Sequence, residues 1–578
     1  MKTRPARSRG AAAIVASMAL LGSGAAAVTA SPAQSAPPGA DCASAFPVDA
    51  ITDGMAVDGL TVTDGTEPEG FTGEVLGVLR DGIAPGVDMV IADLESPEID
   101  RVGIWQGMSG SPVYTAGGEL IGAVAYGLAW GPSSVAGITP YEKMDDYLST
   151  AGETGPVAVD PRTARTIATQ TDVTARQAAQ GMSRLRVPLT ISGVTRARLR
   201  QLRSERDYVT RQGRAGTLVG TAAASAADPA SVKDGGNLGA AMSYGTITAG
   251  GVGTVTDRCG DEVVGFGHPM MFAGATTLGL MPAEAVYIQE DSLGAGFKVA
   301  NLGTPAGTIS QDRLTGITGA MGAGPDEVRV ASSVTYGNRA EEGVSHSLAE
   351  DWHADVTAMQ LLALHDVTID GIQGGSEEAG VQITGTSDGA PFTVTSRDRY
   401  MSGDDIAYSS VWATADLVWL LSRMKGVELD SITTDAVVSD STEAWRIAGV
   451  QRRQRGQWVD LRRRQPTLAT PGSVLRLRTR IVNGDTEKWV RSSVDVPRRR
   501  SGFGQLTVSG GSRFWNDALS GARTVAEVQE AVAEDPRNDQ VVTAVVMETR
   551  HDVATTHSVS ESQDLVVNGR RDFLLGTR

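Results

Sequence analysis

Gly107-Met108-Ser109-Gly110-Ser111-Pro112 is the stretch that decides the fold of this 578-residue chain. A serine between two glycines sits where the backbone can turn tightly, so that consecutive N–H groups converge on one point beside an exposed hydroxyl. The residues that follow, 113–126, predict a strand, a Gly117-Gly118 turn and a second strand. A strand after the serine is typical of a nucleophile loop carried by a β-barrel, and unlike the strand–turn–helix elbow of an α/β-hydrolase. A hairpin turn with incidental serines is the alternative.

Three blocks of the chain resemble the sporulation factor IV B peptidase family (peptidase family S55), which are chymotrypsin-like serine peptidases. The blocks are Phe71–Tyr126, which contains the serine loop, Gly253–Pro269 and Gly307–Arg313. The resemblance covers roughly residues 40–340, and the last third of the chain resembles no family that we can name. It implies a two-lobed β-barrel core that hydrolyses peptide bonds through a Ser-His-Asp type site without a cofactor.

Ser109 is preferred to Ser111 as the nucleophile, because Ser111 precedes Pro112 and is expected to begin the next strand. In a loop of this type, the N–H of the nucleophile and that of the glycine two residues before it form the oxyanion hole. This assigns Gly107 and Ser109 as the donors. Acylation of Ser109 and hydrolysis by water would then follow.

His268 is the candidate general base among the six histidines of the chain. It follows Gly265-Phe266-Gly267, which leaves room beside it, and Pro269 biases its own backbone toward an extended conformation. The family's Gly-His block carries the catalytic histidine, which favours this choice over a structural histidine in a turn.

Asp93 is the preferred third member, because the family's aspartate maps within about a residue of it. Asp100, Asp257 and Asp261 are the alternatives. In the family the histidine block precedes the serine block, whereas here Ser109 comes first. The triad geometry does not depend on chain order, so we expect two barrel halves in swapped order; a site broken by the rearrangement is the alternative.

The N-terminal segment and the net charge indicate an exported protein that does not bind nucleic acid non-specifically. The chain has 51 Lys and Arg against 68 Asp and Glu, a net charge of −17, which argues against non-specific binding of nucleic acid. Basic residues followed by an apolar run to about Val28 and a small-residue site at Ala30 predict a signal peptide over 1–30, with a retained anchor as the alternative. No later stretch has 18 uninterrupted apolar residues, so no further membrane span is expected. We therefore expect a secreted or cell-surface protein.

Two cysteines, Cys42 and Cys259, are expected either to form one disulfide, as an exported protein permits, or to remain free thiols. No Cys/His spacing of a zinc site is present, and no metal is predicted. His346, Glu350 and His353 would share one face if their segment were helical. A solvated helix face is favoured there over a metal site.

The expected fold is mainly β with some helices: a two-lobed chymotrypsin-like barrel core plus a C-terminal β-sandwich-like module. Helices are predicted at 140–148, 197–212, 404–425 and 524–535. The expected segments are a signal peptide (1–30), a flexible lead (31–48), a serine-bearing half (49–150), a partly helical connector (151–235), a histidine-bearing half (236–345), a mixed α/β segment (346–440) and the C-terminal module (441–578).

The sequence thus predicts an exported serine endopeptidase that acts on a protein or peptide substrate, with self-cleavage in 31–48 or 150–235 as a further hypothesis. No nucleic acid partner is expected. Arginine clusters at 452–455, 462–464 and 498–500 are candidates for contact with a polyanion such as a cell-wall polymer, although a solvated strand face is favoured. The alternative function is a catalytically inactive cell-surface scaffold or binding protein.

Overall fold

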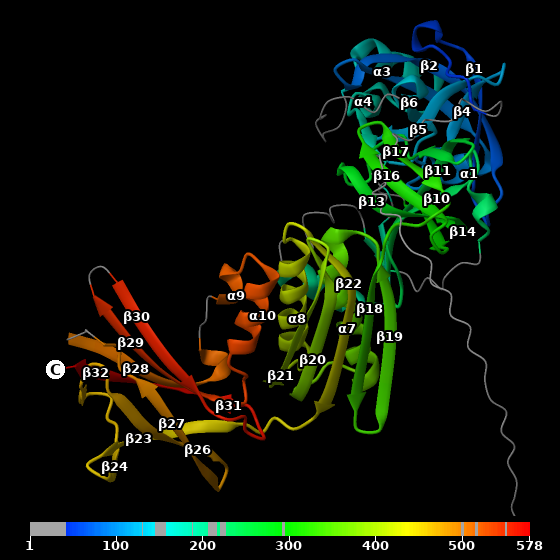
Figure 1. Ribbon diagram of the computed structural model, residues 1–578. Helices are drawn as coiled ribbons and strands as arrows, with labels where there is room; N and C mark the ends of the chain where they lie inside the picture. Colours follow the sequence, from blue (N-terminus) through cyan, green and yellow to red (C-terminus); the bar gives the residue numbers. More distant parts are fainter. Residues whose placement is uncertain are drawn as a thin grey trace, which may run out of the picture.

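A computed structural model of the chain describes most of the residues after the predicted signal peptide (Figure 1). The predicted signal peptide and most of the flexible lead lie outside this part. The structure describes residues 42–129, 131–144, 158–185, 187, 189–205, 217–219, 227–291, 295–498, 502–514, 518–549 and 552–577.

The first unit is a six-stranded antiparallel barrel that carries the serine loop. Its strand order is β4-β1-β2-β3-β6-β5, and pairing of β4 with β5 closes the sheet on itself. The predicted hairpin around Gly117-Gly118 is the β4–β5 connection. The strands are β1 (Ala56–Thr61), β2 (Glu69–Ala84), β3 (Val87–Glu95), β4 (Pro112–Thr115), β5 (Leu120–Leu128) and β6 (Val135–Pro140), with β7 (Met182–Arg184) added beside β5.

Short helices accompany this barrel. The predicted helix at 140–148 begins as α2 and is described only as far as Met144. The elements are η1 (Val48–Ala50), α1 (Pro97–Val102), α2 (Tyr141–Met144), α3 (Pro161–Gln170) and α4 (Ala175–Ala178).

A second six-stranded antiparallel barrel carries His268 and follows the first in the chain. Its order is β10-β13-β16-β17-β12-β11, closed by pairing of β10 with β11. The two-barrel core is therefore confirmed, with the serine-bearing barrel first in the chain. The barrel strands are β10 (Asn237–Gly245), β11 (Thr248–Cys259), β12 (Glu262–Gly265), β13 (Gly274–Met281), β16 (Gly307–Arg313) and β17 (Gly316–Met321). Beside them are β8 (Leu189–Ser192), β9 (Thr217–Val219), η2 (Pro229–Ser231), β14 (Ala283–Gln289) and β15 (Phe297–Leu302).

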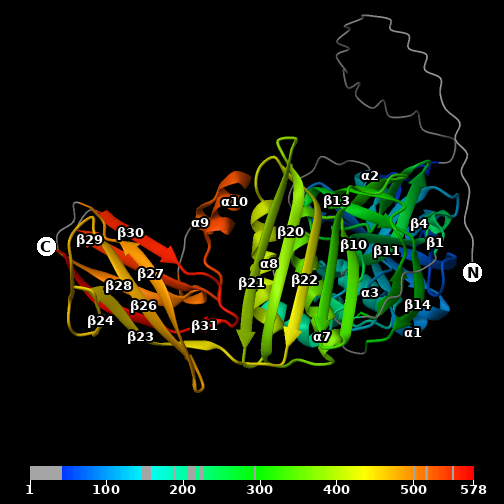
Figure 2. The ribbon, with the colours of Figure 1, turned by 60° about the horizontal axis from the view of Figure 1, so that its bottom comes forward.

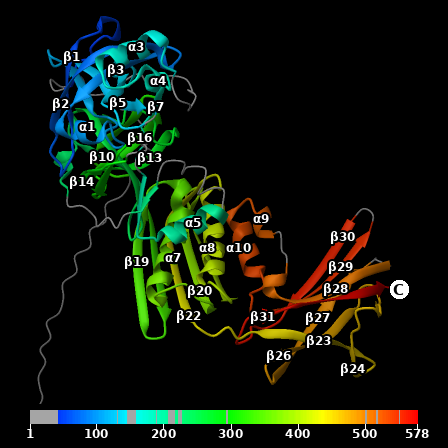
Figure 3. The ribbon, with the colours of Figure 1, turned by 180° about the vertical axis from the view of Figure 1, so that it is seen from behind.

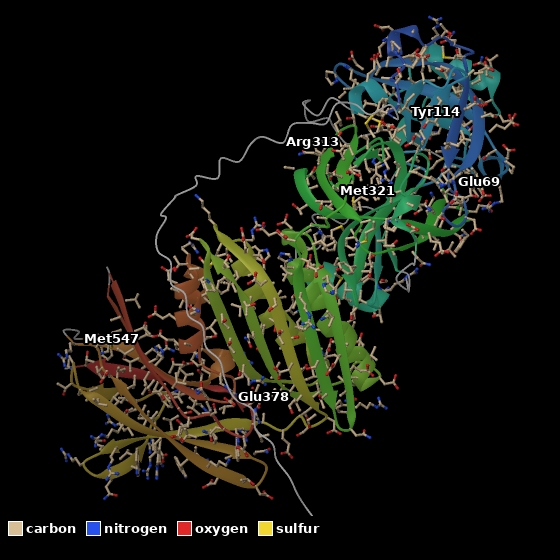
Figure 4. All side chains as sticks on the ribbon, turned by 45° about the vertical axis from the view of Figure 1, so that its right-hand side comes forward. Glu69, Tyr114, Arg313, Met321, Glu378 and Met547 are labelled. Carbon is tan, nitrogen blue, oxygen red and sulfur yellow. A yellow bond between two sulfur atoms is a disulfide. The ribbon has the colours of Figure 1, made fainter. Side chains whose placement is uncertain are left out.

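The two barrels form one lobe, and the rest of the chain extends away from it. Figure 4 shows Tyr114 of the first barrel and Arg313 and Met321 of the second barrel within this lobe, with Met547 at the far end of the molecule. The sheet of the second barrel continues through a β10–β19 pairing into the next unit, so the lobe and that unit share one sheet.

The middle unit is a five-stranded sheet in the order β21-β20-β22-β18-β19, covered on one face by two helices (Figure 2). The predicted helix at 404–425 is α8. The elements are β18 (Val328–Tyr336), β19 (Arg339–Ser347), η3 (Glu350–Trp352), α7 (His353–Ile369), β20 (Gly375–Ser387), β21 (Ala390–Ser402), α8 (Ala407–Ser422) and β22 (Val427–Ser439). None of the helices that the structure describes is long and apolar enough to span a bilayer.

Helix α5 (Arg196–Glu205) joins the connector to the middle unit and lies beside its helices (Figure 3). The buried guanidinium of Arg198 bonds the carboxylates of Asp366 and Asp405. Two carboxylates around one buried arginine are the arrangement that offsets the desolvation of its charge.

The last unit consists of two five-stranded sheets that share a hydrophobic core, as a sandwich does. The predicted helix at 524–535 is α10, and Thr524 caps it by accepting a hydrogen bond from the N–H of Glu527. One sheet contains β23 (Trp445–Gln454), β24 (Gln457–Asp460), β26 (Val474–Asn483), β27 (Thr486–Asp495) and β31 (Val567–Asn568). The other contains β25 (Thr467–Ala469), β28 (Gly502–Gly510), β29 (Val541–Thr549), β30 (Asp552–Val559) and β32 (Arg570–Thr577). The remaining elements are η4 (Gly511–Arg513), α9 (Ala518–Gly521) and α10 (Val525–Glu534).

A disulfide joins Cys42 to Cys259, with Cα atoms 4.7 Å apart across 217 positions of sequence. Just after Cys42, the N–H of Phe46 donates to the carbonyl of Leu120 on the first barrel, whereas Cys259 ends β11 of the second barrel. The bond therefore links the two barrels. Closing so long a loop restricts the unfolded chain, so replacing both cysteines by serine should lower the free energy of unfolding by about 2–5 kcal/mol. Chemical denaturation followed by tryptophan fluorescence, to which Trp105 of the first barrel contributes, measures this change.

Cys42→Ser alone provides the control, because breaking the bond from one side should cost as much as the double substitution. Titration of two free thiols in the denatured, unreduced chain would contradict the disulfide.

Candidate active site

The serine loop leaves α1 and enters β4, and its two glycines adopt backbone conformations that other residues rarely reach. Gly107 has φ +93° and Gly110 has φ +100°. A Cβ on Gly110 would lie 1.9 Å from the carbonyl oxygen of Thr254. Glycine is thus required both for the left-handed turn and for the close approach of the second barrel.

Strand β11 of the second barrel donates three hydrogen bonds to backbone carbonyls of the serine loop. The Thr254 N–H donates to the Ser109 carbonyl at 2.8 Å, and the Thr254 hydroxyl donates to the Gly107 carbonyl at 3.2 Å. The Thr256 hydroxyl donates to the Gly110 carbonyl at 2.8 Å. We assigned no role to these threonines from the sequence. Their spacing of two, which puts both on one face of a strand, is the signal that could have found them.

His268 reaches the serine across the interface between the barrels. Its approach is a strained turn, in which Phe266 (φ +70°) and Gly267 (φ +66°) are both left-handed. A Cβ on Gly267 would lie 3.0 Å from the methyl groups of Ala123 and Ala125 on β5. This turn places His268 Nε2 2.8 Å from Ser109 Oγ.

The other ring nitrogen of His268 sets the tautomer. Nδ1 lies 2.8 Å from the carbonyl oxygen of Pro269. A carbonyl oxygen only accepts hydrogen bonds, so in the neutral ring Nδ1 carries the proton and Nε2 carries the lone pair. The Ser109 hydroxyl therefore donates to Nε2, which is the arrangement that a general base requires.

Both members of the pair are buried, with Ser109 and His268 each 0% exposed. Burial is the main cause that lowers the pKa of His268 to about 3, and the positive charge of Arg184 lowers it further. The imidazole is therefore neutral at pH 7. Because no solvent reaches Ser109 in this conformation, a substrate can enter only after the groups that cover the pair have moved.

The backbone of the loop offers two N–H groups beside the serine. The N–H groups of Met108, Gly110 and Ser111 donate to the carbonyls of Trp105, Val124 and Met108. Within the part of the chain that is described, no hydrogen bond engages the N–H of Gly107 or Ser109. These are the two donors that the sequence analysis assigned to an oxyanion hole.

No hydrogen bond joins the predicted aspartate to the histidine among the described contacts. Asp93 lies on β3, and its buried Oδ1 has no hydrogen-bond partner among the described residues. Asp257 instead accepts a hydrogen bond from the Tyr141 hydroxyl at 2.6 Å. Asp100 and Asp261 are exposed. No carboxylate takes the place that the Pro269 carbonyl occupies at Nδ1.

A different carboxylate fixes the loop that follows His268. Asp312, on β16, accepts hydrogen bonds from the N–H groups of Met270 (2.8 Å), Met271 (2.7 Å) and Ala273 (3.2 Å). Burial raises the pKa of Asp312, while these backbone donors oppose the shift. Asp312 lies in the third block of the family resemblance, to which we assigned no site role.

Ser111, His346 and His353 take no part in the contact between Ser109 and His268. The Ser111 hydroxyl lies 2.9 Å from the Thr61 hydroxyl inside the first barrel and, more weakly, 3.5 Å from the Thr254 hydroxyl of β11. The expectation of a solvated helix face over 346–353 is wrong: His346 is on strand β19, and α7 begins only at His353, which is buried. No cluster of metal-ligating side chains occurs among the residues described.

A second Ser–His pair lies in the middle unit, but it lacks the loop geometry found around Ser109. Nδ1 of the buried His353 lies 2.8 Å from Ser347 Oγ. Ser347, however, is the last residue of β19 and is paired with Ser243 on one side and Val328 on the other. It has no glycine turn around it and no free pair of N–H groups to receive an oxyanion. Among the serines in the described part of the chain, Ser109 alone combines a bonded imidazole with such a turn.

Comparisons of the chain with protein-family models, with curated proteins and with solved structures gave no match. The double barrel is consistent with a chymotrypsin-like fold. Together with the geometry around Ser109, it is the basis for assigning a function.

Proposed function

We propose that this protein is a serine endopeptidase of the sporulation factor IV B type (peptidase family S55), with Ser109 as the nucleophile and His268 as the general base. One observation carries the proposal: the 2.8 Å contact between Ser109 Oγ and the proton-free Nε2 of His268, made between two six-stranded barrels. The resemblance of three sequence blocks to that family supports it.

In this mechanism Ser109 Oγ attacks the carbonyl carbon of the scissile peptide bond while its proton passes to His268 Nε2. The oxyanion that forms accepts hydrogen bonds from the N–H groups of Gly107 and Ser109. The imidazolium then gives its proton to the departing amine, which leaves an ester on Ser109. Water, deprotonated by the same nitrogen, hydrolyses the ester and releases the carboxylic acid.

The third role of a triad, which is to hold the imidazole in one tautomer and orientation, falls to the Pro269 carbonyl in this proposal. A neutral carbonyl stabilises the imidazolium less than a carboxylate does. Asp312 contributes from a distance by fixing the loop, and we therefore propose it as a positioning residue in place of Asp93.

An exported location fits this function. The Cys42–Cys259 disulfide is a bond that persists in oxidising compartments, and it agrees with the signal peptide expected from the sequence. Protein or peptide substrates outside the cytoplasm are the class we propose.

Labelling with a fluorophosphonate probe, which reacts with activated serines, tests the proposal. The purified protein should be labelled once. Ser109→Ala should remove the label completely, because the hydroxyl oxygen that reacts with the probe is lost. Intact mass and in-gel fluorescence measure this, and the same spectra report any self-cleavage during incubation.

Ser111→Ala is the matched control, since it removes a buried serine hydroxyl two residues away and should leave labelling intact. Label retained in Ser109→Ala would overturn the assignment of the nucleophile. A folded wild-type chain that is never labelled would favour the inactive scaffold, an alternative supported by the complete burial of Ser109 and His268.

A further inference from the structure

The basic residues of this acidic chain are concentrated in one part of the C-terminal sandwich. Residues 441–498 contain twelve arginines and one lysine against five acidic residues, so this segment carries a formal charge of +8. Because the whole chain stands at −17, the remainder carries −25. The segment spans β23, β24, β26 and β27, which lie at the end of the molecule opposite the barrels (Figure 2).

The alternation along β26 places its arginines on the outer face of the sheet. Leu475, Leu477, Thr479 and Ile481 are buried in the sandwich core, so Arg476, Arg478 and Arg480 face outward. Residues directly opposite one another on neighbouring strands share a face, and the strand register therefore places further arginines and two tryptophans there. We call this set the arginine face: Arg453, Trp458, Arg476, Arg478, Arg480, Trp489 and Arg491.

Aromatic rings hold the centre of the arginine face in place. The guanidinium carbon of Arg478 lies 4.2 Å from the ring centre of Trp489 and 4.8 Å from that of Trp458. Arg453 lies 5.6 Å from the Trp458 ring. Cation–π contacts of this kind orient a guanidinium without neutralising its charge, so the face is pre-ordered for a partner.

Most of these charges lack a counter-ion within the described structure. Arg480 pairs with Glu487 at 3.3 Å, whereas Arg453, Arg476 and Arg491 have no carboxylate partner among the residues described. Arg478 and Arg491 lie directly opposite each other, and like charges in such a pair are destabilising. An external anion would remove this repulsion.

We propose that the arginine face binds an anionic polysaccharide that carries carboxylate groups. Guanidinium groups bind carboxylates through two parallel hydrogen bonds, and the arginines of β26 recur about every 7 Å along the strand, as a row of sites for an extended polymer. Trp489, 38% exposed, adds an apolar edge for sugar rings. A membrane surface fits less well, because the set offers only two apolar side chains, Trp458 and Trp489, and Arg478 stacks on both rings.

Binding of polygalacturonate to the full-length mature protein tests the proposal, with neutral dextran as the matched polymer. We expect saturable binding of polygalacturonate that weakens as salt is raised, and none of dextran. Arg476→Gln with Arg491→Gln should weaken it by about tenfold or more, since two charge-assisted pairs are lost. Neither side chain makes a hydrogen bond, ion pair or cation–π contact within the described structure, so the variant should retain the wild-type melting temperature.

Arg196→Gln with Arg200→Gln, on the exposed surface of α5, removes the same charge elsewhere and should leave binding unchanged. Arg476→Lys with Arg491→Lys keeps the charge but loses the paired hydrogen bonds, and should bind more weakly than wild type. Equal binding by the glutamine variant and wild type would overturn the site. Tighter binding of polyphosphate, single-stranded DNA or anionic vesicles than of polygalacturonate would overturn the choice of a polysaccharide. None of these results depends on Ser109.

Discussion

Replacing His268 by alanine is expected to slow the reaction of Ser109 with a fluorophosphonate probe by about three orders of magnitude or more, the scale of loss seen when one member of a serine triad is removed. The reason is geometric: Nε2 is the atom that takes the hydroxyl proton, at 2.8 Å, and no other described side chain hydrogen-bonds Ser109 Oγ. Second-order rate constants of labelling measure the effect.

The pH dependence of the same rate tests the state of the imidazole. The pKa of His268 is lowered to about 3, so the neutral, proton-accepting form dominates at every pH well above 3. A second-order rate reports ionisations of the free enzyme, and we therefore expect no acid limb near 6.5, the ordinary value for histidine. A limb at 6.5 would show that the reactive histidine is solvated, which contradicts the buried pair as the resting state.

His353→Ala supplies the control for both measurements. It removes another buried histidine that is bonded to a serine and whose pKa burial lowers to about 4. Its labelling rate should match wild type. An equal loss in His353→Ala and His268→Ala would mean that both substitutions act by unfolding the chain, and the base would then be unassigned.

The sequence could predict the parts of this protein that are specified locally. The hairpin after Ser109 follows from a Gly-Gly turn between two apolar runs, and the helices α8 and α10 follow from their periodicity. The order of the barrels, with the serine-bearing one first, followed from the positions of two motifs in one chain.

Contacts between distant segments could not be predicted in the same way. Asp312 reaches the backbone after His268 across 42 positions of sequence, and the pairing depends on how β16 packs in the barrel. The prediction for residues 346–353 was wrong for a related reason. The spacing alone suggests one face of a helix. In the structure β19 continues to Ser347 because it pairs with β10 and β18, so the helix starts later. Asp93 was chosen by alignment to a family rather than by any contact, and no hydrogen bond joins it to the imidazole in the described structure.

Replacing Asp312 by asparagine is expected to slow labelling of Ser109 by about ten- to a hundredfold, the usual cost of losing a group that orients a functional side chain. The carboxylate accepts three N–H donors from residues 270–273. An amide has one acceptor oxygen and presents an NH2 group to the remaining donors, so the loop must shift. The Pro269 carbonyl, which holds His268 Nδ1, would move with it.

Two readouts separate this positioning role from a general loss of stability. In ¹⁵N-histidine-labelled protein, the hydrogen-bonded Nδ1 proton of His268 should shift or disappear in Asp312→Asn while the melting temperature shows that the barrels remain folded. Asp257→Asn is the matched control, because Asp257 is also a buried acid of the second barrel but bonds only Tyr141 among the contacts described. It should leave both the proton resonance and the labelling rate near wild type. If Asp312→Asn kept the wild-type rate, the tautomer would be secured by the Pro269 carbonyl without help from Asp312. If Asp257→Asn alone slowed labelling, Asp257 rather than Asp312 would be the residue that positions the imidazole.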